Sequence, residues 1–177
     1  SDLGEFPDPA WTDEAVQIRR SIRDDRSLGR AIVLSSSLLP PEDDDRRLAL
    51  LAEAEVYSRR SDNAVGMAWI RYGRAMVRRR AGDLDAAQEL MREAIAWMRR
   101  DQFFFGISVT LIELADLEIE RRQYREAVAH LDEMLGLWEE TLSKELLVAA
   151  VSRIAGLFCS CDRPDAAVTL LSALDAL

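Results

Sequence analysis

The residues of this chain whose types could perform catalysis or bind a metal are few and widely spaced. There is one histidine, His130, and there are two cysteines, Cys159 and Cys161. No cysteine and no second histidine lies four residues from His130, so its surroundings lack the ligand spacing of a zinc site. Cys159 and Cys161 lie two residues apart on an expected helix and therefore face roughly opposite directions. We predict that the chain holds no metal and no cofactor.

The sequence also lacks the patterns that usually carry catalysis. It contains no glycine-rich phosphate-binding loop, and no serine or cysteine is flanked by a residue that would act as its base. A pair of carboxylates could still act together, but no pair stands out. We therefore predict that the protein is not an enzyme, and we look for its function in binding.

Composition narrows the class of partner. Thirty-two acidic residues against 23 basic residues give a net charge of −9, whereas binding to duplex DNA requires Lys and Arg to neutralise phosphates. No apolar run reaches the length of a membrane span, no secretory signal is visible, and two cysteines give no disulfide framework. These features predict a cytoplasmic protein that binds neither nucleic acid nor membrane. We expect residues 1–10 to be a tag or disordered lead, and 11–177 to be a single domain.

A repeat with a step of 40 residues organises the second half of the chain. Three turn-like segments begin at Gly82, Arg122 and Asp162. Each segment ends in an alanine, and another alanine lies twelve residues before it. These pairs are Ala75 and Ala87, Ala115 and Ala127, and Ala155 and Ala167. A fixed period of this size predicts stacked helical hairpins, which bury a core between neighbours and offer a long surface to a partner.

The same pattern predicts an earlier, degenerate copy. The residues from Leu48 to Val56 match those from Ala87 to Ile95 at an offset of 39, with Ser36 in the place of Ala75. Apolar periodicity predicts nine helices, at about 12–26, 28–39, 42–60, 63–81, 84–100, 103–122, 124–140, 144–161 and 164–177. The expected N-caps are Thr12, Ser61 or Asp62, Asp83 and Ser143.

These residues resemble the tetratricopeptide repeat (TPR). That family has a small residue at its eighth position and an alanine at its twentieth, with a Gly-Asp-aromatic turn between them. Gly82-Asp83-Leu84 is similar to this turn, and Val151, Ile154, Ala155 and Phe158 match the family's first-helix spacing. The resemblance implies an all-α, right-handed superhelix of antiparallel hairpins, with a period of 40 rather than the usual 34. It also implies noncatalytic binding.

The longer period and the last segment, Asp162 to Leu174, are similar to the C-terminal repeats of large bacterial signal-transduction ATPases, including LuxR-type transcription regulators. This resemblance implies the regulatory or sensory module of a larger regulator. Its partner would be a protein, a peptide or a small effector. Formation of a homodimer is a further possible interaction. The alternative is a free-standing scaffold that joins two proteins.

The helix expected at 63–81 poses a question of register. Strict spacing from Gly82 fills its packed positions with arginines, where unpaired guanidiniums would be costly. These are Arg71, Arg74 and Arg78. A shift by two residues fills the positions with apolar and small residues instead, namely Trp69, Tyr72, Gly73 and Met76. We favour the shift, which directs Arg74 and Arg78 toward the inner, concave wall.

In the TPR family, residues of the first helix of each hairpin line that inner wall. By this analogy we expect the candidate binding residues of the chain to line the inner wall. They are Arg74, Arg78, Ile112, Asp116, Glu120 and Arg153. Such mixed charge would hold a peptide by its termini and side chains. The competing interpretation is ordinary solvated charge.

Overall fold

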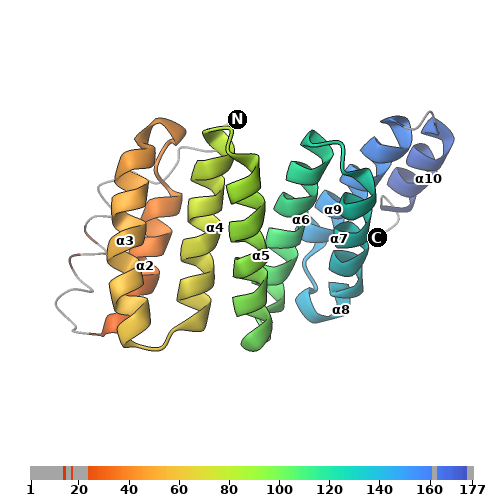
Figure 1. The fold of residues 1–177 in the computed structure, drawn as a ribbon. Helices are drawn as coiled ribbons and strands as arrows, with labels where there is room; N and C mark the ends of the chain where they lie inside the picture. Colours follow the sequence, from red (N-terminus) through yellow and green to blue (C-terminus); the bar gives the residue numbers. More distant parts are fainter. Residues whose placement is uncertain (1–13, 15–16, 18–23, 161–162, 175–177) are drawn as a thin grey trace. The chain divides into compact units, whose positions relative to one another are not determined.

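The computed structural model describes residues 14, 17, 24–160 and 163–174. In this part of the chain the regular structure is helical throughout, with no strand (Figure 1). The elements are α2 (Asp25–Ser37), the 3-10 turn η1 (Pro41–Asp43), α3 (Asp44–Arg60), α4 (Ala64–Arg80), α5 (Leu84–Arg100), α6 (Phe104–Glu120), α7 (Tyr124–Gly136), α8 (Trp138–Thr141), α9 (Lys144–Ser160) and α10 (Pro164–Leu174). The prediction of an all-α array of helical hairpins is confirmed. Most of the helix expected at 12–26, with its cap Thr12, lies outside the described residues.

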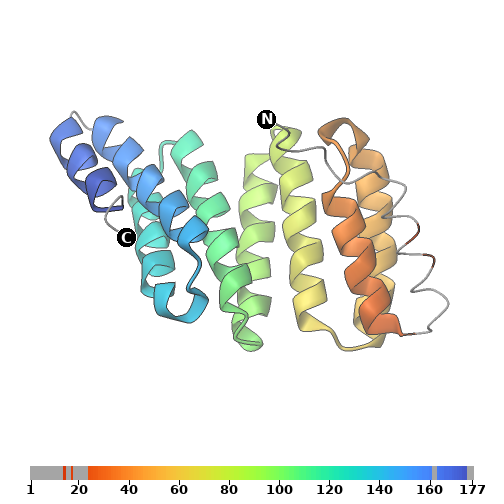
Figure 2. The same ribbon diagram turned by 180° about the vertical axis from the view of Figure 1, so that it is seen from behind.

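The chain divides into two compact units, one ending at Asp101 and the other beginning at Gln102. In unit 1, α2 packs on α3, α4 packs on α5, and α4 also contacts α2 and α3. In unit 2, α6 packs on α7 and α9 packs on α10. Seen from behind, α2 lies in front of α3 in unit 1, and α9 lies in front of α7 in unit 2 (Figure 2). The 40-residue spacing does not predict this division.

The turns between helices explain the period. Residues at a step of 20 adopt positive φ, namely Asp62 (47°), Gly82 (80°), Gln102 (53°), Arg122 (61°) and Leu142 (48°). After Asp62, Gly82 and Arg122, the next residue donates its backbone N–H to the carbonyl five residues earlier: Asn63 to Ser58 (2.9 Å), Asp83 to Arg78 (2.9 Å) and Gln123 to Glu118 (2.8 Å). This is the Schellman ending of a helix. At α4, α5 and α6, a 17-residue helix and a three-residue turn therefore make half of the repeat.

The residue that closes each turn also begins the next helix. Asp83 accepts a hydrogen bond from the N–H of Ala86 (3.2 Å), which confirms it as an N-cap. Ser143 likewise accepts from the N–H of Leu146 (3.4 Å). The predicted cap at Ser61 or Asp62 is wrong, because Asn63 takes this role and accepts from the N–H of Gly66 (3.0 Å). Asp62 cannot do so, since it occupies the left-handed turn position.

The alanines of the repeat lie in the core. All six, Ala75, Ala87, Ala115, Ala127, Ala155 and Ala167, are at most 3% exposed. In the earlier copy, α3 follows α5 at an offset of 40, so the offset of 39 predicted for this helix is wrong. Leu48 is 38% exposed, whereas its neighbour Arg47 takes the place of Ala87 and is 6% exposed. The register of this helix was predicted from apolar side chains, and a charged residue at the alanine position does not fit that pattern.

Arg47 is buried because its guanidinium binds carbonyl oxygens at the end of α2 and a carboxylate at the start of α3. It donates to the carbonyl oxygens of Ser36 (3.0 Å), Leu39 and Pro40 (3.3 Å). It also pairs with the carboxylate of Asp44. Arg80 from the end of α4 donates to the same carboxylate (3.0 Å). The hydrogen bond from Arg80 holds the pKa of Asp44 below its ordinary value, despite partial burial.

The helix expected at 124–140 is interrupted. α7 ends at Gly136, and α8 begins at Trp138 after a single intervening residue. Leu142, which follows α8, is 74% exposed and adopts positive φ. The remaining helices begin and end within a few residues of their predicted bounds.

Candidate functional site

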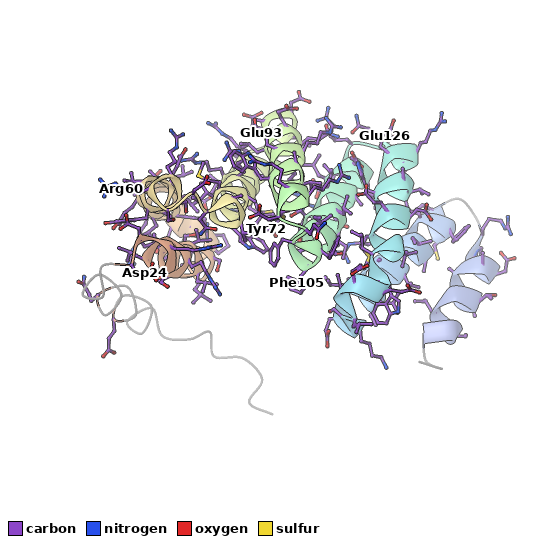
Figure 3. The ribbon with its side chains drawn as sticks, turned by 90° about the horizontal axis from the view of Figure 1, so that it is seen from below. Asp24, Arg60, Tyr72, Glu93, Phe105 and Glu126 are labelled. Atoms are coloured by element: carbon purple, nitrogen blue, oxygen red, sulfur yellow. The ribbon has the colours of Figure 1, made fainter. Side chains whose placement is uncertain are left out.

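Helix α4 presents two partly exposed faces to its surroundings. At 100° per residue, the spacing 3-4 places Arg71, Arg74 and Arg78 on one face. The spacing 4-3-4 places four apolar and aromatic residues on a roughly opposite face: Val65, Trp69, Tyr72 and Met76. Figure 3 shows Tyr72 and Glu93 on opposite sides of unit 1. Glu93 lies on α5, and it is the partner of Arg71.

The arginine face is paired with acids of α3 and α5. Arg74 donates to Glu55 of α3 (2.6 Å), and Arg71 donates to Glu93 of α5 (2.7 Å). Arg71 also lies over the ring of Trp97, with its Cζ 5.1 Å from the ring centroid. The guanidiniums of Arg71 and Arg74 are therefore partly buried with acidic partners. The cost of burying unpaired guanidiniums, which favoured a shifted register, does not arise.

Burial of Glu55 opposes its ionisation, but the hydrogen bonds from Arg74 and Arg59 outweigh this effect. The pKa of Glu55 is consequently below its ordinary value of 4.5. Arg78 makes a longer and more exposed contact with Asp83 (3.8 Å). Arg74 therefore reaches α3, and Arg78 shares its face of α4.

Both registers proposed for α4 describe part of its packing. Ala75 is fully buried, as strict spacing predicts. Gly73 belongs to the shifted register, and an added Cβ there would lie 2.9 Å from Leu51 Cδ1. α4 contacts helices on two sides, so one packed stripe cannot account for it. Trp69, Tyr72 and Met76 are half-buried rather than buried.

Helix α2, which packs beside α4, also carries an exposed apolar side chain. Trp69 and Tyr72 form an edge-to-face pair, with ring centroids 5.3 Å apart and an interplanar angle of 88°. On α2, Leu34 is 60% exposed and Arg30, one turn earlier, is also exposed. We define the α2/α4 face by the residues Arg30, Leu34, Trp69, Tyr72 and Met76. It combines an exposed aliphatic side chain, half-exposed aromatic rings and positive charge.

In unit 2 the predicted candidates Asp116 and Arg153 are brought together. Arg153 of α9 donates to Asp116 of α6 through Nε and a terminal nitrogen, both at 2.6 Å. Glu120 is exposed at the end of α6, and Ile112 is 4% exposed and therefore part of the core. The bidentate pair holds α6 against α9 and leaves both charges largely compensated.

His130 has a structural partner. Its Nδ1 lies 2.8 Å from Oε2 of Glu118, which is fully buried on α6. Within the described part of the chain, no group of three or more His, Cys, Asp and Glu side chains is arranged to hold a metal ion. In the same residues, no helix has both the length and the apolar character needed to cross a bilayer.

Comparison with known proteins establishes the architecture. The sequence matches no protein-family model and no curated protein. Two solved structures of a putative kinesin light chain from Podosopora anserina, described as nearly identical TPR-like repeats, each align with 95% of this chain and 84% of theirs. The TM-scores are 0.64 for a Q17M variant and 0.61 for the second structure, both at 16% identity. The fold is TPR-like. At this identity the similarity concerns the fold alone.

Sequence reasoning missed the α2/α4 face of this TPR-like chain as a surface. It noticed Trp69, Tyr72 and Met76 but assigned them to the core, because their spacing matches the packed pattern of the TPR first helix. The signal that separates the two interpretations is the alternation of Arg with these residues. One face of α4 must be opposite the other, and the arginine face is the one that meets Glu55 of α3 and Glu93 of α5.

Proposed function

We propose that this chain is a noncatalytic binding module whose α2/α4 face contacts an extended segment of a protein partner. The observation that carries the proposal is the half-exposed Trp69–Tyr72 pair on α4, together with Leu34 on the neighbouring helix α2, which is 60% exposed. Tryptophan and tyrosine dominate the energetics of protein interfaces, because they bury much apolar area for little conformational entropy. The TPR-like architecture supports the proposal, since such arrays offer long helical surfaces.

The arginine face of α4 is a weaker candidate for the same role. Its guanidiniums are already paired with Glu55 and Glu93 of the same unit. A ligand there would have to replace those contacts, and exchange of one ion pair for another yields little free energy. On unit 2, Asp116, Glu120 and Arg153, supported by buried Ile112, make a second, polar contact surface in this proposal.

A regulatory role is the second candidate. It is favoured by the similarity of the segment from Asp162 to Leu174 to the last repeats of LuxR-type regulators. In that case a small effector would raise the melting temperature through binding linkage, whereas a scaffold would respond only to a protein. A thermal-shift screen of metabolites against the whole chain separates the two. We place either protein in the cytoplasm, and the molar mass in solution tests the expected possibility of a homodimer.

Selection of peptides from a random display library tests the main proposal. The whole chain should enrich peptides that no longer bind the Trp69→Ala variant. Trp97→Ala is the matched control, because Trp97 lies on α5 beside Arg71 and Arg100. Failure to enrich any peptide, or enrichment that survives Trp69→Ala, contradicts the proposal.

A further inference from the structure

We infer that the Glu118–His130 pair decides the pairing of α6 with α7, by making α9 and α10 poorer partners for either helix. The two side chains meet across the first hairpin of unit 2, where Nδ1 of His130 lies 2.8 Å from Oε2 of Glu118. Glu118 is fully buried, and the His130 side chain is 25% exposed. The inference goes beyond the proposed function, because neither residue belongs to the α2/α4 face.

The pair is a local departure from the 40-residue repeat. Leucine occupies the position of His130 in the other three hairpins, at residues 50, 90 and 170. In the last hairpin, α9 carries Phe158 where α6 carries Glu118, and Phe158 is half-buried. The sequence of the last hairpin therefore supplies an apolar pair, phenylalanine and leucine, at the place where α6 and α7 carry a polar one.

The two hairpins of unit 2 are otherwise alike. Both begin with a 17-residue helix. In the turns that follow, backbone N–H groups bond the equivalent carbonyls, from Gln123 to Glu118 (2.8 Å) and from Arg163 to Phe158 (2.9 Å). The same buried alanines recur at the helix contacts, namely Ala115 and Ala127 in one hairpin and Ala155 and Ala167 in the other. Similar units of this kind make repeat proteins prone to misassembly and to exchange of elements between copies.

A wrong pairing would separate the two polar groups. If α6 packed on the α10 helix of a second copy, Glu118 would be buried against leucine. If α9 packed on α7, Phe158 would face His130. Burial of a carboxylate without its partner is strongly destabilising, whereas replacement of both members of a buried polar pair by well-packed apolar residues is often neutral or stabilising. Selective pairing therefore accounts for the pair better than stability does, as it does for single polar residues in coiled coils.

Refolding of the whole chain tests the inference. The apolar variant combines Glu118→Phe with His130→Leu and so copies the last hairpin. The matched control is His130→Gln, because the amide of glutamine can still donate a hydrogen bond to Glu118. Each protein is unfolded in urea and refolded at high protein concentration. Size-exclusion chromatography with light scattering then measures the dimers that persist on dilution, as dimers with exchanged hairpins do.

We expect the apolar variant to match or exceed the urea midpoint of the wild type. It should also form at least about tenfold more persistent dimer, because loss of one hydrogen bond to a charged group changes a pairing equilibrium by that factor or more. The His130→Gln variant should form no more persistent dimer than the wild type does.

A urea midpoint of the apolar variant far below that of the wild type would show that the pair serves stability, and it would overturn the inference. Equal fractions of persistent dimer in the apolar variant and the wild type would overturn it as well. So would a His130→Gln variant that exchanges hairpins as readily as the apolar variant. None of these results bears on the proposed function, which the Trp69→Ala variant tests separately.

Discussion

Arg153 of α9 and Asp116 of α6 form a bidentate ion pair in unit 2, with both nitrogen–oxygen distances at 2.6 Å. The two residues are 37 positions apart in the chain, and their side chains are 29% and 24% exposed. The pair connects the first helix of one hairpin to the first helix of the next. It therefore acts on the stacking of hairpins rather than on a single helix.

A double-mutant cycle should give this pair a coupling energy of about 1 kcal/mol, since partial burial and bidentate geometry place it at the upper end for surface pairs. The variants are Asp116→Asn, Arg153→Gln and the double variant, compared by urea denaturation. The pair Arg163–Asp165 is the control, because its side chains are 61% and 74% exposed and its distance is 3.5 Å. Equal coupling in the two pairs would show that the bidentate geometry contributes nothing.

Substitution of Arg47 by alanine should be severely destabilising. The guanidinium satisfies three backbone carbonyls and an acid while nearly buried, and loss of such a group costs about 3 kcal/mol. Arg46→Ala is the control at the adjacent, exposed position and should cost less than about 1 kcal/mol. Chemical denaturation followed by circular dichroism measures both. A small effect of Arg47→Ala would mean that water replaces its hydrogen bonds.

Arg47 also shows why part of the fold escaped the sequence. Alanines recur because two helices approach closely at those positions, and only a small side chain fits between them. A repeated alanine in the sequence therefore indicates where helices are close. At position 47 the same site is filled by an arginine that folds back onto carbonyls of Leu39 and Pro40. No apolar or small-residue pattern encodes this arrangement, so the register of α3 was displaced by one residue.

The turns supply a test of backbone strain. Gly82 has φ of 80°, and an added Cβ would meet no atom within 4 Å. Gly82→Ala should therefore cost about 1 kcal/mol through the backbone alone. Gly156→Ala should instead stabilise by about 0.5–1 kcal/mol, because Gly156 lies inside α9 with open space at its Cβ.

At the equivalent position of another turn, substitution by glycine should increase the free energy of unfolding. Arg122 has φ of 61° without being glycine, so Arg122→Gly should stabilise the protein by about 1 kcal/mol. Thermal denaturation of the three variants gives the order Arg122→Gly and Gly156→Ala above wild type, and Gly82→Ala below it. A loss of stability in Arg122→Gly would show that its side chain matters more than its backbone conformation.

Acid should weaken the contact between α3 and α4. The folded-state pKa of Glu55 is lowered from 4.5, so ionised Glu55 contributes stability that is complete above that value and is lost as pH falls through the folded pKa. Glu55→Gln should be less stable than wild type at pH 7, and the difference should shrink below about pH 4.5. Unfolding measured between pH 7 and pH 2 checks this. A difference that stays constant over the range contradicts the pairing with Arg74 and Arg59.

The candidate site was less accessible to sequence reasoning than the fold. Spacing correctly identified that Trp69, Tyr72 and Met76 share a face, because helical periodicity fixes that relationship. Spacing does not reveal whether a face is covered, since coverage depends on which helices pack beside α4. Spacing also does not reveal the partners of Arg71 and Arg74, because their acids come from α5 and α3, at separations of 22 and 19 residues.

NMR of the tryptophan indoles tests the central claim most directly. The chain contains four tryptophans, and each gives one indole N–H signal that a Trp→Phe variant assigns. On addition of a peptide selected from the display library to the whole chain, the account predicts that the Trp69 signal shifts while that of Trp97 does not. A shift of Trp97 with Trp69 unchanged would place the ligand on the arginine side of α4 and contradict the account.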